Sequence, residues 1–307
     1  MRLSAIVPAT NRPATLARCV EAIRSADEAP DELIVVEEAP GPGPAAARNE
    51  GARRATGDVL VFVDADVVPH RDAFARIRAG FGADSHLAAL FGSYDDAPEA
   101  PGVVAGFRNL LHHHVHQEGG GPAATFWAGL GAVRREVFDA AGGFDAARYP
   151  RPSIEDIELG ARLAALGAKI VLDPAVQGTH LKAWTLAEMV RTDFSARGIP
   201  WVELLLGGGA SASALNLGWR HRLSAVASLA VVGGLVLRRP AAAAAAAGVL
   251  VALNGPFYAL LARRRGVFQA TLGVALHAVH HLTAVASVPA GAASFALRRP
   301  AARAEGP

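Results

Sequence analysis

The chain has 307 residues, of which 51% are hydrophobic and 19% charged, and its formal net charge is only +2. Its single cysteine, Cys19, excludes an internal disulfide and favours a reducing environment. The basic residues accompany apolar stretches and not aromatic-bearing polar faces, which argues against a nucleic-acid partner. A chain of this length suits one large domain followed by a smaller segment.

The first part of the chain alternates short apolar runs with helical patterns. We expect strands at residues 3–7, 33–36 and 59–63, separated by helices at residues 15–25 and 45–55. Strands that alternate with helices of about ten residues give a β-α-β-α-β unit. The sequence therefore predicts an α/β fold with a mostly parallel central sheet and helices on both faces.

The third expected strand ends on two carboxylates, Asp64 and Asp66. Residues 59–63 show no polar alternation, which indicates a strand buried on both faces. Two acids at its carboxyl end are costly unless a positive charge lies between them, and this end of a strand is where ligands bind in α/β sheets. A divalent cation carrying a phosphorylated ligand satisfies both conditions. The alternative is that one acid caps the next helix and the other is solvated.

Several motifs in this order resemble family 2 glycosyltransferases with the GT-A fold. They lie at residues 4–12, 46–51, 57–66, 128–145, 153–163 and 180–182. Each motif is weak alone, and together they cover about the first two-thirds of the chain. The resemblance implies a Rossmann-like GT-A catalytic domain that takes a sugar from a nucleotide-sugar donor.

The resemblance also implies roles for five residues. The second acid of the D-x-D turn contacts the metal in this family, which makes Asp66 a ligand of Mn²⁺ or Mg²⁺ and leaves Asp64 to bind the ribose or support the metal. His180 stands where a third ligand often lies, although it is otherwise an ordinary histidine after a strand. Asp156 matches the general base, and Glu155 would orient the acceptor or the base. Acids in a first helical turn also serve as simple caps. A single base predicts inversion at the sugar carbon.

The remaining implied residues form a donor-binding surface. They are Pro8, Thr10, Arg12, Glu37, Glu38, Arg48, Asn49, Asp64, Ala65, Trp127 and Gly129. Arg48 is expected near the pyrophosphate, whereas Trp127 either packs against the donor sugar or fills the core. The family usually has two aspartates where this chain has Glu37 and Glu38. The base of the donor therefore stays open, with a UDP-sugar as the first expectation.

The composition changes after Glu203, because no Asp or Glu follows until Glu305 while Arg and His continue. Apolar runs at residues 223–237, 241–262 and 267–297, interrupted by arginines, predict two to four transmembrane helices. A soluble alanine-rich bundle is the alternative, but it would carry acids on an outer face.

These patterns predict a chain of four parts. The expected parts are a transferase domain at residues 1–207, a linker or interfacial segment at 208–222, membrane helices at 223–297 and a basic tail at 298–307. The protein is then a multi-pass protein of the cell membrane. Its catalytic domain faces the cytoplasm, where nucleotide sugars are found.

Two histidine groups have no assigned role. The tract at residues 112–116 is expected to be a surface or acceptor-side segment without metal. His277, His280 and His281 share one helical face, where they contact a lipid phosphate or pack between helices.

The combined prediction is a membrane-anchored inverting glycosyltransferase with a lipid-linked or cell-envelope acceptor. Transfer is expected to be non-processive, because the sequence has no Gln-x-x-Arg-Trp motif. A non-catalytic membrane scaffold and a sugar nucleotidyltransferase are the alternatives. The second needs a glycine-rich basic loop after the first strand, which residues 8–13 lack.

Overall fold

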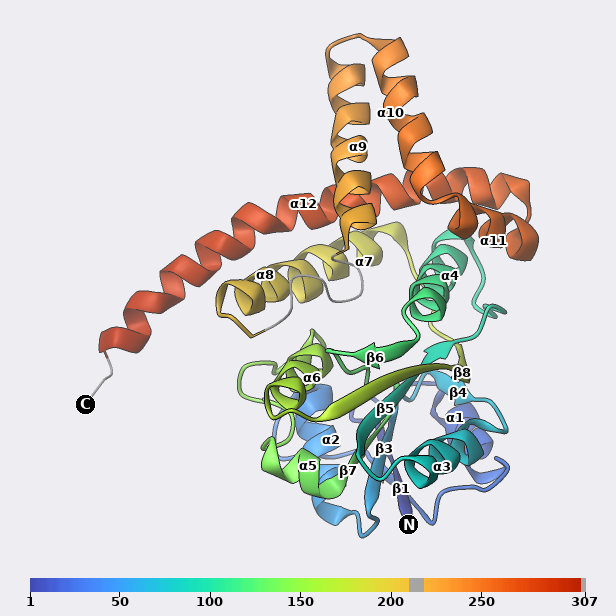
Figure 1. Ribbon diagram of the computed structural model, residues 1–307, viewed down its shortest axis with the longest axis vertical. Coiled ribbons are helices and arrows are strands. Elements are labelled where there is room, and N and C mark those ends of the chain that lie inside the picture. The colour runs from blue at the N-terminus through green and yellow to red at the C-terminus, as the bar shows by residue number, and fades with distance from the viewer. Residues whose placement is uncertain (210–217, 305–307) are drawn as a thin grey trace. The chain divides into compact units, whose positions relative to one another are not determined.

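A computed structural model describes residues 1–209 and 218–304, so parts of the expected linker and tail, at 210–217 and 305–307, lie outside it (Figure 1). The chain divides into two compact units. The first comprises Met1–Ala100 and His112–Lys182, and the second comprises Pro101–Leu111 and Ala183–Pro307. The division after Lys182 lies earlier than the expected boundary at residue 207. The short segment Pro101–Leu111 belongs to the second unit although it lies within the sequence of the first.

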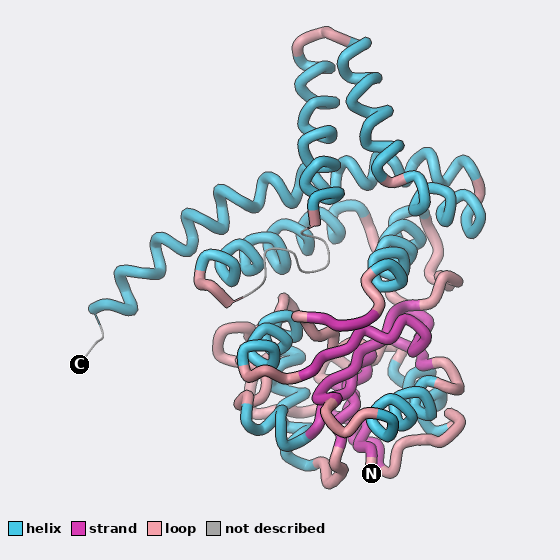
Figure 2. The backbone as a smooth tube through the Cα atoms, in the orientation of Figure 1, coloured by secondary structure: helices cyan, strands magenta, loops and turns pink. Residues whose placement is uncertain are grey.

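The first unit is built on one mixed sheet (Figure 2). Its strands are β1 (Leu3–Pro8), β2 (Glu32–Val36), β3 (Val59–Val63), β4 (Val67–Pro69), β5 (Leu87–Tyr94), β6 (Gly121–Ala123), β7 (Leu130–Arg134) and β8 (Lys169–His180). Within the described residues their order is β2-β1-β3-β7-β5-β8-β4, with β6 paired to β8. The pairs β1–β2, β1–β3 and β5–β8 are parallel. Strand β7 is antiparallel to both β3 and β5, so the first half of the sheet is parallel as predicted and the second half is mixed.

Helices cover both faces of this sheet (Figure 1). They are α1 (Leu16–Arg24), α2 (Gly43–Arg54), α3 (Ala73–Ala83), α5 (Arg135–Ala140) and α6 (Glu155–Ala165), together with the end of α4 (Val103–Glu118), whose first residues belong to the second unit. The predicted strand at 59–63 matches β3, and the other predicted elements begin and end within two residues of β1, β2, α1 and α2.

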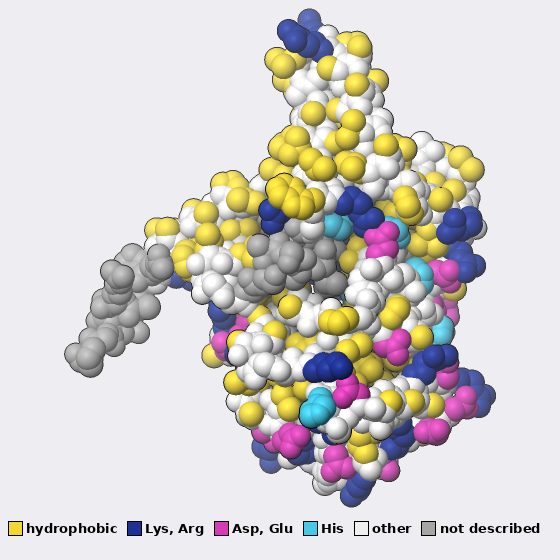
Figure 3. All heavy atoms as spheres, viewed as in Figure 1, with side chains coloured by type: hydrophobic (Ala, Val, Ile, Leu, Met, Phe, Trp, Pro, Cys, Tyr) yellow, Lys and Arg dark blue, Asp and Glu magenta, His cyan; other side chains and the backbone are white. Residues whose placement is uncertain are grey.

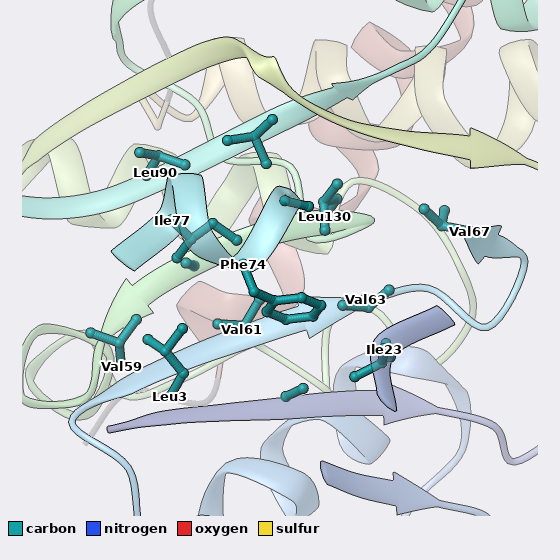
Figure 4. Close-up of a cluster of buried hydrophobic side chains, with 14 of the residues drawn as sticks. Leu3, Ile23, Val59, Val61, Val63, Val67, Phe74, Ile77, Leu90 and Leu130 are labelled. Atoms are coloured by element: carbon teal, nitrogen blue, oxygen red, sulfur yellow. The ribbon is translucent and has the colours of Figure 1, made fainter. Parts of the chain in front are cut away.

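Strand β3 lies in the middle of the core, with every residue buried. Val61 and Val63 belong to the apolar cluster that also contains Ile23 of α1 and Phe74 of α3 (Figure 4). Phe62 points to the other face, where its ring centroid is 5.1 Å from that of Phe144. Two-sided burial explains why the strand is continuously apolar, and it leaves Asp64 and Asp66 at the strand's carboxyl end.

The second unit is helical over its described residues. Besides the start of α4, it contains α7 (Leu186–Arg191), a π-helical segment η1 (Thr192–Gly198), α8 (Ile199–Leu206), α9 (Trp219–Val236), α10 (Pro240–Leu253), α11 (Gly255–Arg265) and α12 (Val267–Ala304). Helices α9 and α10 form a hairpin (Figure 1). They pack closely at Gly234, where an added Cβ would lie 2.8 Å from the backbone nitrogen of Ala243.

This unit buries several polar side chains and exposes many apolar ones. Exposed positions on α9 include Leu223, Val226, Leu229, Val232 and Leu235, and Figure 3 shows hydrophobic atoms over the hairpin with basic residues at its turn. Buried positions include Ser224, Ser228, Asn254, His277, His281, Thr283 and Ser287. The amide of Asn254 donates to the Ser224 hydroxyl at 2.9 Å, which links α9 to the end of α10. The unit thus combines a partly apolar surface with buried polar side chains.

One described helix, over Val267–Arg298, is long and apolar enough to cross a membrane. Helices α10 and α11 meet the same criterion only as a pair, and they are bent by 78° at their junction. Length and composition therefore allow one span, or two if the bent pair is one span. The hairpin helix α9 does not meet the criterion alone.

The His277–His281 group lies on the buried face of α12. The Nδ1 atom of His280 is 2.8 Å from Oδ2 of Asp193, and Oδ1 of the same carboxylate accepts a hydrogen bond from Arg108 at 2.8 Å. Tyr258 and His277 are joined by a 3.0 Å hydrogen bond, and the His277 ring lies 4.4 Å from that of His281. This geometry favours the interpretation that the histidines pack between helices.

A glycine on α2 provides a test of the packing in the first unit. A Cβ added to Gly51 would lie 2.3 Å from Cγ2 of Ile6 on β1, a buried strand that cannot easily move. We expect Gly51→Ala to lower the free energy of unfolding by about 1–3 kcal/mol, because overpacking outweighs the better helix propensity of alanine. Calorimetric unfolding of the intact chain in detergent measures the change.

Gly82→Ala, on α3, is the matched control. No heavy atom lies within 4 Å of the position of its Cβ, so this variant should be as stable as the wild type or slightly more stable. Equal thermal stability of the two variants would contradict the proposed close contact between α2 and β1.

Candidate active site

Carboxylates from two elements surround one buried arginine in the first unit. Asp64 follows β3, Glu155 begins α6, and Arg48 lies in the middle of α2. Nη2 of Arg48 is 2.7 Å from Oδ1 of Asp64, and its Nη1 is 2.9 Å from Oε1 of Glu155. The side chains of Arg48 and Glu155 are each only 5% exposed. The fold thus joins three predicted site residues that are far apart in sequence.

Asp156, the predicted base, lies next to this group. Its carboxylate accepts hydrogen bonds from the backbone nitrogens of Ala128 at 3.1 Å and Ile157 at 2.8 Å. Burial, and then the charge of Glu155, raise the pKa of Asp156 to about 6, although the Arg48 guanidinium acts in the opposite direction. A carboxyl group with such a pKa is suited to accept a proton near neutral pH.

Close packing fixes the helix that carries Asp156. Helix α6 approaches the chain before β7 at Gly160, where an added Cβ would lie 2.2 Å from the backbone nitrogen of Phe126. The same stretch of chain supplies the Ala128 nitrogen that binds Asp156. Glu155 is held in addition by the backbone nitrogen of Ser153, which donates to its second oxygen at 2.8 Å.

Asp66 and His180 converge, as the metal hypothesis requires. Strand β4 pairs with the end of β8 so that Val67 lies opposite His180. Oδ2 of Asp66 is then 3.6 Å from Nε2 of His180. Burial alone would raise the pKa of Asp66, but the hydrogen bond and charge of His180 and the charge of Lys182 lower it overall. The carboxylate is therefore ionised at neutral pH.

These two side chains fit a Mn²⁺ or Mg²⁺ ion that is completed by other ligands. A carboxylate oxygen and an imidazole nitrogen are both accepted by Mn²⁺. Within residues 1–209 and 218–304, no three His, Cys, Asp or Glu side chains form a metal site by themselves. A hard cation prefers six oxygen or nitrogen ligands, so phosphate oxygens and water would have to supply the rest.

An aromatic cluster adjoins His180. The His180 ring stacks on Tyr94 at 4.2 Å with an interplanar angle of 10°. Tyr94 also contacts His112 at 4.1 Å and Trp127 at 4.9 Å, measured between ring centroids. Trp127 lies over Gly129, where a Cβ would be 2.3 Å from the indole. Part of the 112–116 tract is therefore aromatic packing beside the predicted ligand.

Sequence reasoning missed Tyr94. It carried no motif, because its position next to His180 results from the parallel pairing of β5 with β8, in which Tyr94 aligns with Gly178. That pairing joins strands more than seventy residues apart, and a single sequence contains no signal for it.

The other predicted donor residues lie at the ends of β1 and β2 or along α2. Arg12 and Glu37 form a loose, exposed ion pair at 3.8 Å. The side-chain amide of Asn49 makes two hydrogen bonds with the backbone of Phe144. Its Nδ2 donates to the Phe144 carbonyl oxygen at 2.8 Å, and its Oδ1 accepts from the Phe144 nitrogen at 2.9 Å. Pro8, Thr10, Glu38 and Ala65 lie at these same strand ends, and Ala65 is buried. Arg48 is therefore in direct contact with Asp64 and Glu155, whereas Asn49 binds α2 to the loop at Phe144.

With this geometry in place, part of the chain can be compared with a known family. Residues 37–141 match the family model described as glycosyl transferase family 2. The matched segment is therefore similar to glycosyl transferase family 2. It contains Arg48, Asp64, Asp66 and Trp127, while Asp156 and His180 follow it in the same unit. No curated protein matches the whole sequence significantly.

Solved structures support the fold of this chain. The mannosyltransferase PcManGT from Pyrobaculum calidifontis, in complex with GDP-Man and Mn²⁺, is 20% identical with a TM-score of 0.52, over 92% of this chain and 87% of its own. TarS 1–349 of S. aureus is 14% identical with a TM-score of 0.46, over 92% and 90%. Glucosyl-3-phosphoglycerate synthase from Mycobacterium tuberculosis, with Mg²⁺ and UDP, is 19% identical with a TM-score of 0.47, over 69% and 81%. The fold is GT-A, confirming the predicted class.

The raised pKa of Asp156 predicts a stability effect. The folded state binds this proton more tightly than the unfolded chain, so the stabilisation is complete below pH 3.8 and is lost as the pH rises to about 6. Asp156→Asn removes the buried charge and keeps an acceptor for Ala128. Above pH 6 and without metal, we expect this variant to be more stable than the wild type by up to about 3 kcal/mol.

Thermal unfolding in EDTA at pH 4 and pH 8 tests this effect. Asp139→Asn, which changes an exposed acid on α5, is the control and should leave stability unchanged at both pH values. An equal effect of Asp156→Asn at both pH values would show that the carboxylate is not destabilised in the folded protein.

Proposed function

We propose that this protein is a membrane-anchored, inverting, non-processive glycosyltransferase that moves a sugar from a nucleotide-sugar donor to a lipid-linked or cell-envelope acceptor. The observation that carries the proposal is the placement of Asp156 and of the Asp66–His180 pair in one unit, around the strand ends of a family 2 segment. A base and a site for a charge-neutralised leaving group are the two requirements of such a transfer.

The proposed mechanism divides the work among the carboxylates. Asp66 and His180 would hold Mn²⁺ or Mg²⁺, which when bound would supply the positive charge that the diphosphate of the leaving nucleotide requires. Asp156 removes the proton of the acceptor hydroxyl, whose oxygen then attacks the sugar carbon opposite the departing diphosphate. One displacement with one base inverts the configuration, so an α-linked donor gives a β-linked product.

Donor binding is assigned to the strand ends. We propose that Pro8, Thr10, Arg12, Glu37 and Glu38 contact the nucleoside. Asp64 binds the ribose or supports the metal, and Trp127 with Gly129 lines the sugar. The structural relatives were solved with GDP-Man or UDP, so both guanine and uracil donors merit testing.

Membrane anchoring is assigned to the second unit. Its exposed apolar residues and buried polar residues suit a lipid environment, where helix contacts are made by small and polar side chains. The region after Glu203 lacks acids up to Glu305, and arginines flank its apolar runs. We propose a multi-pass arrangement with the first unit on the cytoplasmic side, where nucleotide sugars are available.

A non-catalytic membrane scaffold that retains the GT-A fold is the second candidate. The partly buried Asp156, whose pKa is raised to about 6, argues against it, since a purely structural protein gains nothing from a carboxyl group whose ionisation is costly.

Nucleotide binding is the first test. We expect UDP or GDP to bind the detergent-solubilised chain only with Mn²⁺, and Asp66→Asn to weaken this binding by at least about tenfold, because a charged metal ligand is lost. Isothermal calorimetry measures both effects. Asp139→Asn serves as the control and should bind as the wild type does. Absence of Mn²⁺-dependent binding of either nucleotide to the wild type would favour the scaffold.

Alkaline carbonate extraction tests the membrane assignment. The intact chain should stay in the membrane pellet. A double variant, Val226→Arg with Leu229→Arg on α9, should be extracted to a greater extent, because each arginine costs about 3 kcal/mol in hydrocarbon. The control, Leu166→Arg, changes an exposed residue of the first unit and should have no effect. Complete extraction of the wild type would exclude anchoring by this unit.

A further inference from the structure

The Arg48 guanidinium is a fixed connection between two halves of the candidate active site. Its Nη2 binds Asp64 at 2.7 Å and its Nη1 binds Glu155 at 2.9 Å, over a sequence separation of 107 residues for the second contact. The side chain is 5% exposed, and its remaining Nε has no hydrogen-bond partner among the described residues. Both ends of the guanidinium fork are therefore occupied by protein carboxylates.

The surroundings of Arg48 hold it in this position. Asn49, the next residue of α2, binds both the nitrogen and the carbonyl oxygen of Phe144. The Phe144 ring lies 5.4 Å from the guanidinium carbon and also packs against Phe62 of β3. Gly51 permits α2 to lie directly on β1. Helix α2 is thus fastened on three sides, and Arg48 cannot turn toward solvent without breaking these contacts.

Each carboxylate that Arg48 binds is a close chain neighbour of a residue with a proposed chemical role. Asp64 precedes the proposed metal ligand Asp66 by two residues, and Glu155 directly precedes the proposed base Asp156. The fork of an arginine is planar and rigid, so it fixes the two carboxylates at a set distance and angle. Any displacement between the end of β3 and the start of α6 would change the distance from base to leaving group.

We propose that Arg48 is a positioning residue of the transfer reaction: by bridging Asp64 and Glu155 it fixes the metal side of the site relative to the base, and it does not bind the donor phosphates. This inference rests on the proposed transferase function. It replaces the expectation, drawn from sequence, that Arg48 contacts the pyrophosphate.

Electrostatics gives the proposal a measurable signature. The charged groups that act on Asp156 are Glu155, Asp64 and Arg48, and of these three only Arg48 stabilises the ionised base, in addition to the backbone hydrogen bond from Ala128. Loss of the Arg48 charge should therefore move the acidic limb of the pH–rate profile to higher pH. Loss of the Glu155 charge should move it to lower pH. A residue that only stabilises the fold would change neither limb.

The experiment measures release of UDP from UDP-glucose, or of GDP from GDP-mannose, with Mn²⁺ as a function of pH and donor concentration. For Arg48→Met we expect kcat to fall by about 100-fold or more, because the reacting groups are misplaced, with the donor KM within about threefold of the wild type. Arg48→Lys should restore the pH profile but only part of the rate, since an ammonium cannot bridge both carboxylates. Arg53→Met, on the exposed side of α2, is the control and should behave as the wild type does.

Two outcomes overturn the proposal. A large rise in the donor KM of Arg48→Met with little change in kcat would show that Arg48 binds the phosphates. A loss of rate with no shift of the pH profile in either Arg48→Met or Glu155→Gln would reduce Arg48 to a structural role. Glu155→Gln preserves the shape of the side chain and a hydrogen bond from Arg48, so it tests the pH shift even if Arg48→Met does not fold.

A crystal structure of Arg48→Lys provides a readout that does not depend on activity. We expect the Glu155 carboxylate to leave its position beside Asp64 and the start of α6 to shift. Unchanged positions of Asp64, Glu155 and Asp156 would overturn the positioning role whether or not the wild type transfers sugar. Absence of nucleotide binding or donor cleavage in the wild type would instead contradict the proposed function, so the two failures are distinguishable.

Discussion

The candidate site depends on balancing buried negative charge. Strand β3 is buried on both faces, and the side chains of Asp64 and Asp66 that follow it are 31% and 30% exposed. Arg48 offsets the charges of Asp64 and Glu155, while His180 lies against Asp66. Burial, and then the charge of Glu155, raise the pKa of Asp156 to about 6. A divalent cation and a proton are then the two positive charges that this arrangement still accepts.

The two units place polarity in opposite ways, and this difference separates their roles. In the first unit, apolar side chains fill both faces of the sheet and the charges concentrate at strand ends. In the second, serine, asparagine and histidine side chains lie inside beside buried apolar residues, while many leucine and valine side chains lie outside. Catalysis requires a rigid, water-excluding frame for charged groups, whereas a lipid environment rewards internal hydrogen bonds and an apolar surface.

Local sequence patterns predicted much of the first unit. The strand at 59–63, the acids after it and the acidic start of α6 all followed from short apolar runs and their polar ends. The antiparallel insertion of β7 between β3 and β5 did not follow, because strand order depends on contacts between distant segments. For the same reason Tyr94 escaped notice, and Arg48 was assigned to the donor phosphates and not to Glu155. The early end of the first unit, at Lys182, also lacked a local signal, since no break in composition occurs there.

The position of Arg48 also bears on why helix α2 carries charged residues on its buried side. Helix α2 buries Arg48 and Glu50 as well as its alanines, which is unfavourable for a helix that only covers a sheet. Glu50 is satisfied by Arg53 and Arg54 at the protein surface, so its cost is small. Arg48 does not reach the protein surface, and its burial is favourable only because it forms ion pairs with two carboxylates from other elements. The small alanines beside it let α2 lie close enough to the sheet for the guanidinium to reach both. The composition of helix α2 is therefore consistent with placing the positive charge of Arg48 in the site.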